Sequence, residues 1–374
     1  MRRTVTIMSR ATRSAFGAEF DVPPAYFNTP SIGIPPAVVA DAVAGAVDRW
    51  RRGADDPPDF TAAVDASRAS FARIVGVPAE RIAVGATVAG LLAPVAAGLP
   101  DGARVLTAKG DFTSVTFPFA AQAYRGVTVE EVPLAALPSA VEGHDLVAVS
   151  VVQSADGTVA DLDGLAEAAA DAGVPVALDV TQAAGWLPLA LDWADWVVGS
   201  GYKWLLSPRG AAWLAVHPRV LDAGRPVGAN WYAGQDPWDT VYGLPLRLAS
   251  GARRYDASPA WLPFVGAAAA LDYVAGLDMR AVYEHCTGLA DRLRGELGLA
   301  PAGSAIVSLD TTSLDAASRD TDSLDTASPG GTGVSPERLA EAGVRASMRA
   351  GGLRLGCHLY TTSEDVDRVV EALR

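Results

Sequence analysis

Helical stretches alternate with short apolar runs from about residue 36 to residue 200, and this alternation constrains the fold more than any other feature. Helices between strands imply crossover connections, which build a mainly parallel sheet with helices on both faces. We therefore expect an α/β fold. The expected helices cover residues 37–52, 60–75, 89–99 and 162–172, and the expected strands cover residues 82–84, 104–107, 127–132, 146–152, 175–179 and 193–199.

The chain has 374 residues, which exceeds a single ordinary core and predicts about two domains. We expect an N-terminal arm at residues 1–25, a large domain at residues 26–255 and a small C-terminal α/β domain at residues 256–374. The first 20 residues contain Arg and Ser, few acids and no hydrophobic signal segment, so they are predicted to form a flexible arm.

The small domain is expected to contain a helical region at about residues 263–297, an apolar strand at residues 353–360 and a capped helix beginning at Thr362. Ser-Leu-Asp occurs at residues 308, 313 and 323, and the first copy is expected to end a strand. The segment that follows is rich in Ser, Thr, Asp and Gly, which bury too little apolar area to offset the entropy of ordering. We therefore predict a poorly ordered loop at about residues 311–333.

Charge and cysteine content narrow the class of protein. The chain carries 30 basic and 43 acidic residues, and a net charge of −13 disfavours nucleic acid or an acidic membrane as a partner. Two cysteines, in no metal-binding spacing, exclude a disulfide framework and favour a reducing compartment. Residues 82–100 carry no charge and meet the length of a membrane span, but their pattern favours a buried strand, turn and helix. We expect a cytoplasmic protein that acts on a small molecule, with no metal.

Lysine is nearly missing from the sequence: Lys109 and Lys203 are the only two among the 30 basic residues. A lysine amine can lose its proton and attack a carbonyl carbon, whereas an arginine guanidinium stays protonated. Lys203 follows the apolar run 193–198 and precedes the turn-forming residues 207–210. The pattern predicts a nucleophilic lysine on a loop at the end of a strand.

Asp179 comes 24 residues before Lys203, at the C-terminal end of a second apolar run. α/β sheets place ligand-binding groups at the carboxyl ends of their strands. A carboxylate there, followed by a loop lysine, fits pyridoxal phosphate chemistry: the lysine holds the aldehyde and the carboxylate keeps the pyridine nitrogen protonated. A buried aspartate can equally be a helix cap or an ion-pair partner.

Five segments carry a more specific signal, and they are residues 85–87, 111–114, 179–182, 200–204 and 353–367. In this order they resemble the class V aminotransferase family, which includes cysteine desulfurases, kynureninases and isopenicillin N epimerase-like proteins. The resemblance spans nearly the whole chain. It implies a fold-type I, pyridoxal phosphate-dependent enzyme that transforms an amino acid and forms a homodimer.

The resemblance also implies roles for individual residues. Lys203 would hold the cofactor as an aldimine and then move the Cα proton, while Asp179 would pair with the pyridinium nitrogen. The other implied cofactor contacts are Phe112 stacked on the ring, Gln182 and Ser154 near the phenolic oxygen, Ala86, Thr87 and Val88 at a helix N-terminus around the phosphate, Ser200 and Tyr202 as hydroxyl donors, and Ser258 at the phosphate site of the partner subunit.

Arg354 is the candidate for binding the substrate carboxylate, because a planar guanidinium binds a carboxylate through two parallel hydrogen bonds. Arg349 competes for this role. Arg354 is favoured because an arginine between Leu353 and Leu355 on a strand would be costly to bury without an anionic partner. Asn28 and the Asn230-Trp231 pair are possible residues of the substrate pocket wall.

Several reactions stay open at this point. A persulfide-forming desulfurase needs a cysteine ahead of the carboxylate arginine, and none lies between Cys286 and Arg354. Transamination leads, with β-elimination, kynureninase-type cleavage and epimerisation as alternatives that share its first steps. A nicotinamide-dependent dehydrogenase is a remote alternative, because no G-x-G-x-x-G opens a helix after an early strand. A binding protein without catalysis is disfavoured, because the chain retains all four of the residues Asp179, Gln182, Lys203 and Arg354.

Overall fold

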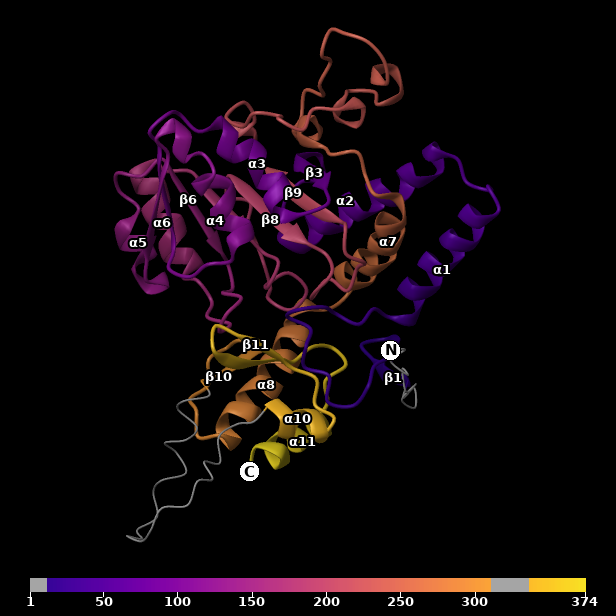
Figure 1. Ribbon diagram of the computed structural model, residues 1–374, viewed down its shortest axis with the longest axis vertical. Helices are drawn as coiled ribbons and strands as arrows, with labels where there is room; N and C mark the ends of the chain where they lie inside the picture. The colour runs from indigo at the N-terminus through magenta and orange to yellow at the C-terminus, as the bar shows by residue number, and fades with distance from the viewer. Residues whose placement is uncertain (1–11, 311–335) are drawn as a thin grey trace, which may run out of the picture.

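The computed structural model describes residues 12–310 and 336–374 (Figure 1). The loop predicted at residues 311–333 and the first 11 residues of the predicted arm lie outside the described residues.

A seven-stranded sheet forms the larger part, in the strand order β3-β9-β8-β7-β6-β4-β5. The strands are β3 Ile82–Gly85, β4 Arg104–Ala108, β5 Thr128–Val132, β6 Leu146–Ser150, β7 Val176–Asp179, β8 Trp196–Ser200 and β9 Ala212–Val216. The six expected strands are present, and the mainly parallel sheet is confirmed. The seventh strand, β9, was not predicted; it lies antiparallel to both β3 and β8.

Alternate residues of each strand enter two separate cores. In β6, Val147 and Val149 belong to one core, while Leu146 and Ala148 belong to the other. The inner strands are buried and largely apolar because helices cover both faces of the sheet, whereas the edge strand β5 carries two glutamates and is partly exposed. One face packs against α2 Thr61–Val75, α5 Leu137–Ala140, α6 Leu162–Ala172 and α7 Trp261–Ala275, and the other packs against α3 Val88–Gly98 and α4 Thr113–Ala120. Helix α1 Ala37–Arg51 packs outside this layer, against α7.

The uncharged segment 82–100 is β3, a turn and α3, as the pattern predicted. Thr87 caps α3, and its hydroxyl accepts a hydrogen bond from the Gly90 amide. Helix α3 continues through Pro94. Within residues 12–310 and 336–374, no single helix is long and apolar enough to cross a membrane; α7 and α8 Met279–Glu296 reach that limit only as a pair bent by 90°.

A three-stranded antiparallel sheet forms the smaller part, in the order β10-β12-β11. Its elements are β10 Ile306–Asp310, β11 Ser347–Arg349, β12 Gly352–Gly356, α8, α10 Pro336–Glu341 and α11 Ser363–Leu373. Thr362 caps α11 in a capping box with Asp365. The expected helical region at 263–297 is two helices. Helix α7 packs against α1 and α2 of the larger part. The predicted domain boundary after residue 255 therefore assigns to the small domain a helix that packs with the large one.

The described residues of the predicted arm form a hairpin of β1 Thr12–Ala15 and β2 Ala18–Asp21. Arg13 makes an ion pair with Asp365 of the C-terminal helix α11, and Phe20 is fully buried. The expectation of a flexible arm is therefore wrong for residues 12–21, because one buried aromatic ring and one ion pair attach them to the body of the protein.

Replacing Asp256 should destabilise the fold strongly. The Asp256 side chain is buried, pairs with Arg68 at 3.0 and 3.1 Å, and accepts a hydrogen bond from the Val84 amide of β3. Asp256→Ala would remove the close partner of a buried guanidinium and leave it only the exposed Asp65 at 3.7 Å, at a cost of about 3–5 kcal/mol. The midpoint of urea unfolding should fall accordingly. Asp272→Ala is the control, since it removes an exposed pair with Arg73; an equal fall in both variants would contradict this role of Asp256.

Candidate active site

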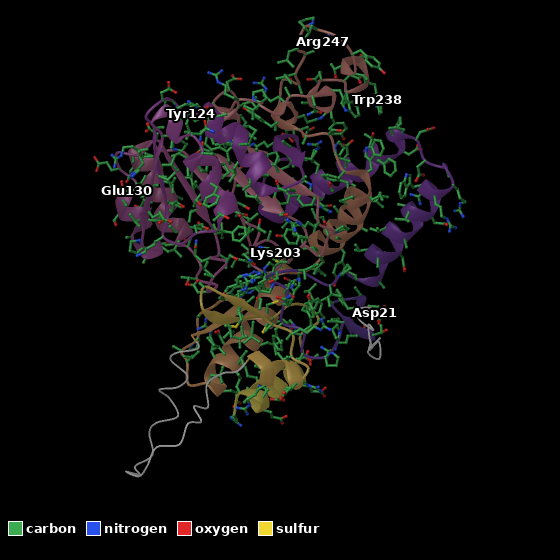
Figure 2. The ribbon with its side chains drawn as sticks, viewed as in Figure 1. Asp21, Tyr124, Glu130, Lys203, Trp238 and Arg247 are labelled. Carbon is green, nitrogen blue, oxygen red and sulfur yellow. The ribbon has the colours of Figure 1, made fainter. Side chains whose placement is uncertain are left out.

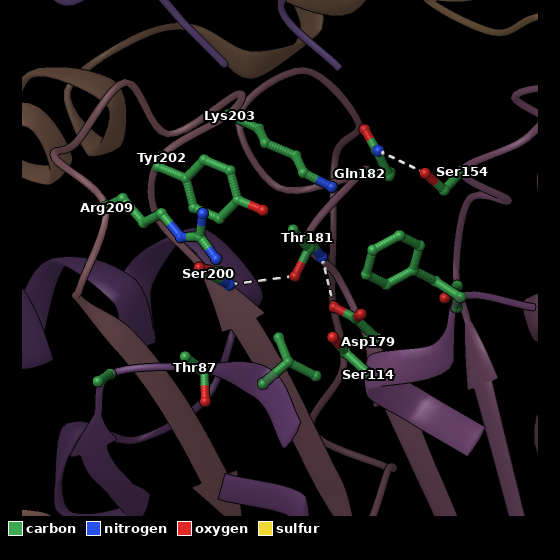
Figure 3. A pocket seen from close by; sticks show the side chains of 14 residues that line it. Thr87, Ser114, Ser154, Asp179, Thr181, Gln182, Ser200, Tyr202, Lys203 and Arg209 are labelled. Carbon is green, nitrogen blue, oxygen red and sulfur yellow. Dashed lines mark hydrogen bonds between the residues drawn. The ribbon is translucent and has the colours of Figure 1, made fainter. Parts of the chain in front are cut away.

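A small cavity lies at the edge of the large sheet where β3, β4, β6, β7 and β8 have their carboxyl ends. These ends meet because β3 is antiparallel to β9 and β9 is antiparallel to β8, so β3 and β8 run in the same direction. The cavity measures about 70 Å³. Its lining residues (Figure 3) are Ala86, Thr87, Val88, Phe112, Ser114, Ser150, Ser154, Asp179, Thr181, Gln182, Ser200, Tyr202, Lys203 and Arg209.

Lys203 lies on the loop that follows β8, where the large sheet meets the small one (Figure 2). Its side chain is buried, and burial lowers the pKa of its amine to about 8, against a smaller opposing effect of Asp179. The Nζ atom lies 5.2 Å from the centroid of the Phe112 ring. Gly33 packs directly against this loop, and its amide donates a hydrogen bond to the Tyr202 carbonyl. Only glycine fits at this position, because a Cβ atom would lie 2.0 Å from the Lys203 carbonyl oxygen. The predicted nucleophile is thus a buried amine that deprotonates readily.

Asp179 is the last residue of β7, and its side chain enters the same cavity. Its Oδ1 atom accepts a hydrogen bond from the Thr181 amide at 2.8 Å. Burial raises the pKa of this carboxyl to about 6, although Lys203 acts to lower it. Within the described residues no cationic side chain makes an ion pair with Asp179, so the carboxylate can accept a proton-bearing nitrogen from a ligand.

The side of the cavity next to α3 is suited to an anion. The N-terminus of α3, capped by Thr87, contributes backbone N–H groups and the positive end of the helix dipole. The Arg209 guanidinium lies 5.4 Å over the Tyr202 ring, and Ser200 ends β8 beside it (Figure 3). The sequence analysis did not single out Arg209; the only available signal was its place in the turn after the lysine loop.

Three further lining residues, Ser114, Ser150 and Thr181, were also missed. Thr181 accepts a hydrogen bond from the Ser200 amide and joins the β7 loop to the end of β8. Ser150 donates to the buried Asp111 carboxylate at 2.5 Å, and Asp111 also accepts the Phe112 amide. Each of the three lies at a strand end or a helix start. Their position next to the predicted strand ends could have identified them as residues of the site.

Gln182, Ser154 and Arg354 form a hydrogen-bonded chain that leads from the cavity to the small sheet. Gln182 donates to the Ser154 hydroxyl at 3.0 Å and accepts from the Trp204 indole at 2.7 Å. The Arg354 Nη1 atom donates to the same hydroxyl at 3.0 Å, and Nη2 donates to Ser31 Oγ at 2.9 Å. The structure therefore brings the predicted carboxylate-binding arginine beside the lysine cavity.

Arg354 is 1% exposed and, among the residues described, makes no ion pair. Burial and, to a smaller extent, the neighbouring Arg349 lower the pKa of its guanidinium to about 10. A buried guanidinium that has only serine and carbonyl oxygens as acceptors is well suited to receive a carboxylate.

Three predicted residues lie elsewhere. Asn28 lines a separate cavity of about 540 Å³ beside β11, together with Tyr26. Asn230 caps a short helix and donates to the Asp256 carbonyl. Ser258 is exposed and follows Ala257, whose amide donates to Val84 of β3. None of the three lines the cavity that contains Lys203.

The model of the family named aminotransferase class-V matches residues 47–369. The chain belongs to this family. The resemblance inferred from the sequence is therefore confirmed, and with it the assignment to a family of pyridoxal phosphate-dependent enzymes.

Relatives and solved structures agree with this membership. The chain is 24% identical over 328 residues to an uncharacterised aminotransferase of Bacillus subtilis, covering 82% of each chain. It is 26% identical over 343 residues to isopenicillin N epimerase of Streptomyces clavuligerus, covering 82% of this chain and 83% of the relative. A solved cystine C-S lyase superposes with a TM-score of 0.77 at 20% identity, over 94% of this chain and 97% of the other, which supports the fold-type I architecture.

The uptake of pyridoxal phosphate by cofactor-free protein should follow the ionisation of Lys203. Only the neutral amine attacks an aldehyde, so the rate should rise with pH and reach half its maximum at about pH 8, rather than near the ordinary lysine value of 10.5. Stopped-flow absorbance at a series of pH values measures this rate. Lys203→Arg should abolish uptake and borohydride trapping at this position, whereas Lys109→Arg should preserve both. A midpoint near pH 10 would contradict the assigned state of the amine.

Proposed function

We propose that this enzyme binds pyridoxal phosphate at Lys203 and catalyses the transamination of an amino acid. The observation that carries the proposal is the buried amine of Lys203 and the buried carboxylate of Asp179 in one small cavity, with no ion pair between them. Both charges are costly to hold there unless a ligand carries matching groups. Pyridoxal phosphate has such groups in its aldehyde and its ring nitrogen, and when bound it withdraws electrons from the substrate Cα.

The residues of the chain have separate tasks in this reaction. Asp179 accepts a hydrogen bond from the ring nitrogen and stabilises its proton. Phe112 covers one side of the cavity with an aromatic surface that carries no exchangeable proton. The Lys203 amine, with its pKa lowered to about 8, takes up the Cα proton at Nζ near neutral pH. The N-terminus of α3, Ser200 and Arg209 bind the phosphate.

Two observations disfavour two other reactions, epimerisation and sulfur transfer. Epimerisation by two opposed bases would need a second proton carrier across from Lys203, and the ring nearest its Nζ atom is the apolar Phe112. Sulfur transfer would need an accessible thiolate. Cys286 and Cys357 are both fully buried, and burial raises the pKa of each thiol above its ordinary range.

A single-turnover experiment tests the reaction. Cofactor-loaded protein is mixed with one amino acid at a time, without an acceptor, and the cofactor form and products are separated by chromatography. We expect the pyridoxamine form and one 2-oxo acid per subunit, and neither from Lys203→Ala. Pyruvate-type products and ammonia with the aldehyde intact would show a lyase instead. A racemised amino acid alone would show an epimerase, and failure to retain the cofactor would refute the proposal.

Arg354→Lys should impair substrate binding. Lysine keeps the positive charge but cannot present two parallel N–H groups to a carboxylate. Losing one charged hydrogen bond lowers kcat/KM by about 10- to 100-fold, mainly through KM, while the cofactor absorbance stays unchanged. Arg292→Lys is the matched control, because Arg292 pairs with Asp367 on the surface of the small part. Equal kinetics in both variants would exclude Arg354 as the carboxylate site.

We also propose a homodimer. A loop segment at residues 224–250 projects from the large part (Figure 1). Five of its large apolar side chains are exposed to an extent unusual for a monomer, and they are Val227, Trp238, Tyr242, Leu244 and Leu246. Burial of this surface against a second copy would remove it from water, and the exposed Ser258 stays the candidate for a contact with the phosphate site of the partner.

A further inference from the structure

Arg349 and Arg354 lie on one hairpin, formed by β11 and β12. The register pairs Ser347 with Arg354 and Arg349 with Gly352, so the two arginines are diagonal neighbours on the same face. Ala350 and Gly351 form the turn with φ values of 48° and 82°, and a two-residue turn with both residues left-handed fixes this register. The hairpin lies beneath the carboxyl edge of the large sheet (Figure 1), and Lys203 lies at this boundary (Figure 2).

The two guanidiniums converge on one hydroxyl group. Ser31 Oγ lies 2.9 Å from Nη2 of Arg354 and 3.3 Å from Nη2 of Arg349. Like charges this close repel each other, and a neutral hydroxyl offsets little of that repulsion. A ligand with two negative groups would offset this repulsion, because each group could pair with one of the two guanidiniums.

Neither arginine makes an ion pair with any residue in the described parts of the chain, whereas Arg13, Arg68 and Arg219 each pair with an aspartate. The α-carboxylate of the substrate neutralises one guanidinium of the hairpin. The groups that would hold the cofactor phosphate, the N-terminus of α3 at Thr87 together with Ser200 and Arg209, belong to the large part, so the phosphate would not neutralise the second arginine of the hairpin. One positive charge beside the substrate therefore stays unmatched when an amino acid with a neutral side chain binds.

We propose that Arg349 binds an anionic group on the substrate side chain, so that the enzyme acts on amino acids with an acidic side chain. The inference rests on the proposed function. Arg354 is buried and is linked through Ser154 to Gln182 in the cavity, which assigns it to the α-carboxylate. Arg349 is exposed at the turn end of the hairpin and shares Ser31 Oγ with Arg354, so it is the guanidinium left for a second anionic group.

Substrate preference and ligand binding test the inference together. The single-turnover rate is measured with aspartate and glutamate and with their neutral isosteres asparagine and glutamine. Calorimetry on the cofactor-loaded protein compares succinate, which has two carboxylates, with butyrate, which has one. We expect a preference of about tenfold or more for the acidic member of each pair and tighter binding of succinate, with both effects reduced by salt.

Arg349→Gln should reduce each preference roughly tenfold, whereas Arg345→Gln should preserve it. Arg345 is a matched control, because it is an exposed arginine of the segment leading into β11. Wild-type protein that binds the cofactor and transaminates neutral amino acids as well as acidic ones would overturn the inference and leave the proposed function standing. If both variants lost the preference equally, the preference would come from the positive charge of the surface in general and not from Arg349, and the inference would also be overturned. Failure to bind the cofactor would refute the proposed function itself.

Discussion

The antiparallel strand β9 determines where the site forms. It lies between β3 and β8 and reverses direction against both, so these two strands end at the same edge although about 110 residues separate them. The N-terminus of α3 therefore lies beside the loop that carries Lys203. A parallel strand in that place would require a long crossover, whereas the loop at residues 201–211, which carries Lys203, connects the antiparallel strands β8 and β9 directly.

Two kinds of buried charge have different roles in this structure. Arg68 and Asp256 are paired and hydrogen-bonded, and they hold β3 against the segment that follows residue 252. Lys203 and Asp179 are buried without such pairing, so their desolvation shifts both pKa values toward neutral pH. The first pair stabilises the edge of the sheet, and the second is left destabilised until a ligand arrives. Unpaired buried charges that face a cavity therefore mark the reactive end of the sheet.

The sequence predicted the parts of the fold and site that depend on local pattern. Buried parallel strands are short apolar runs, and Lys203 was conspicuous because lysine is so rare in this chain. Strand β9 was missed although its residues form a short apolar run like those of the other buried strands. Ser31 could not be predicted, since only the tertiary fold brings it beside Arg354, whereas Arg209 could have been found from its place in the turn after Lys203. Asn28 lies apart because neighbouring Tyr26 pairs with Arg345 and draws this segment to the small sheet.

The acceptors around Arg354 explain how a buried arginine can stay available for a substrate. Its partners are the hydroxyl groups of Ser31, Ser154 and Ser347 and one carbonyl oxygen, all of them neutral. A carboxylate partner inside the protein would neutralise the guanidinium and compete with the incoming substrate, because it would occupy the two parallel N–H groups that bind a carboxylate. Neutral acceptors orient the guanidinium and meet its hydrogen-bonding needs without cancelling its charge. An anionic ligand can therefore displace them with a net gain, and the arginine is oriented before the ligand binds.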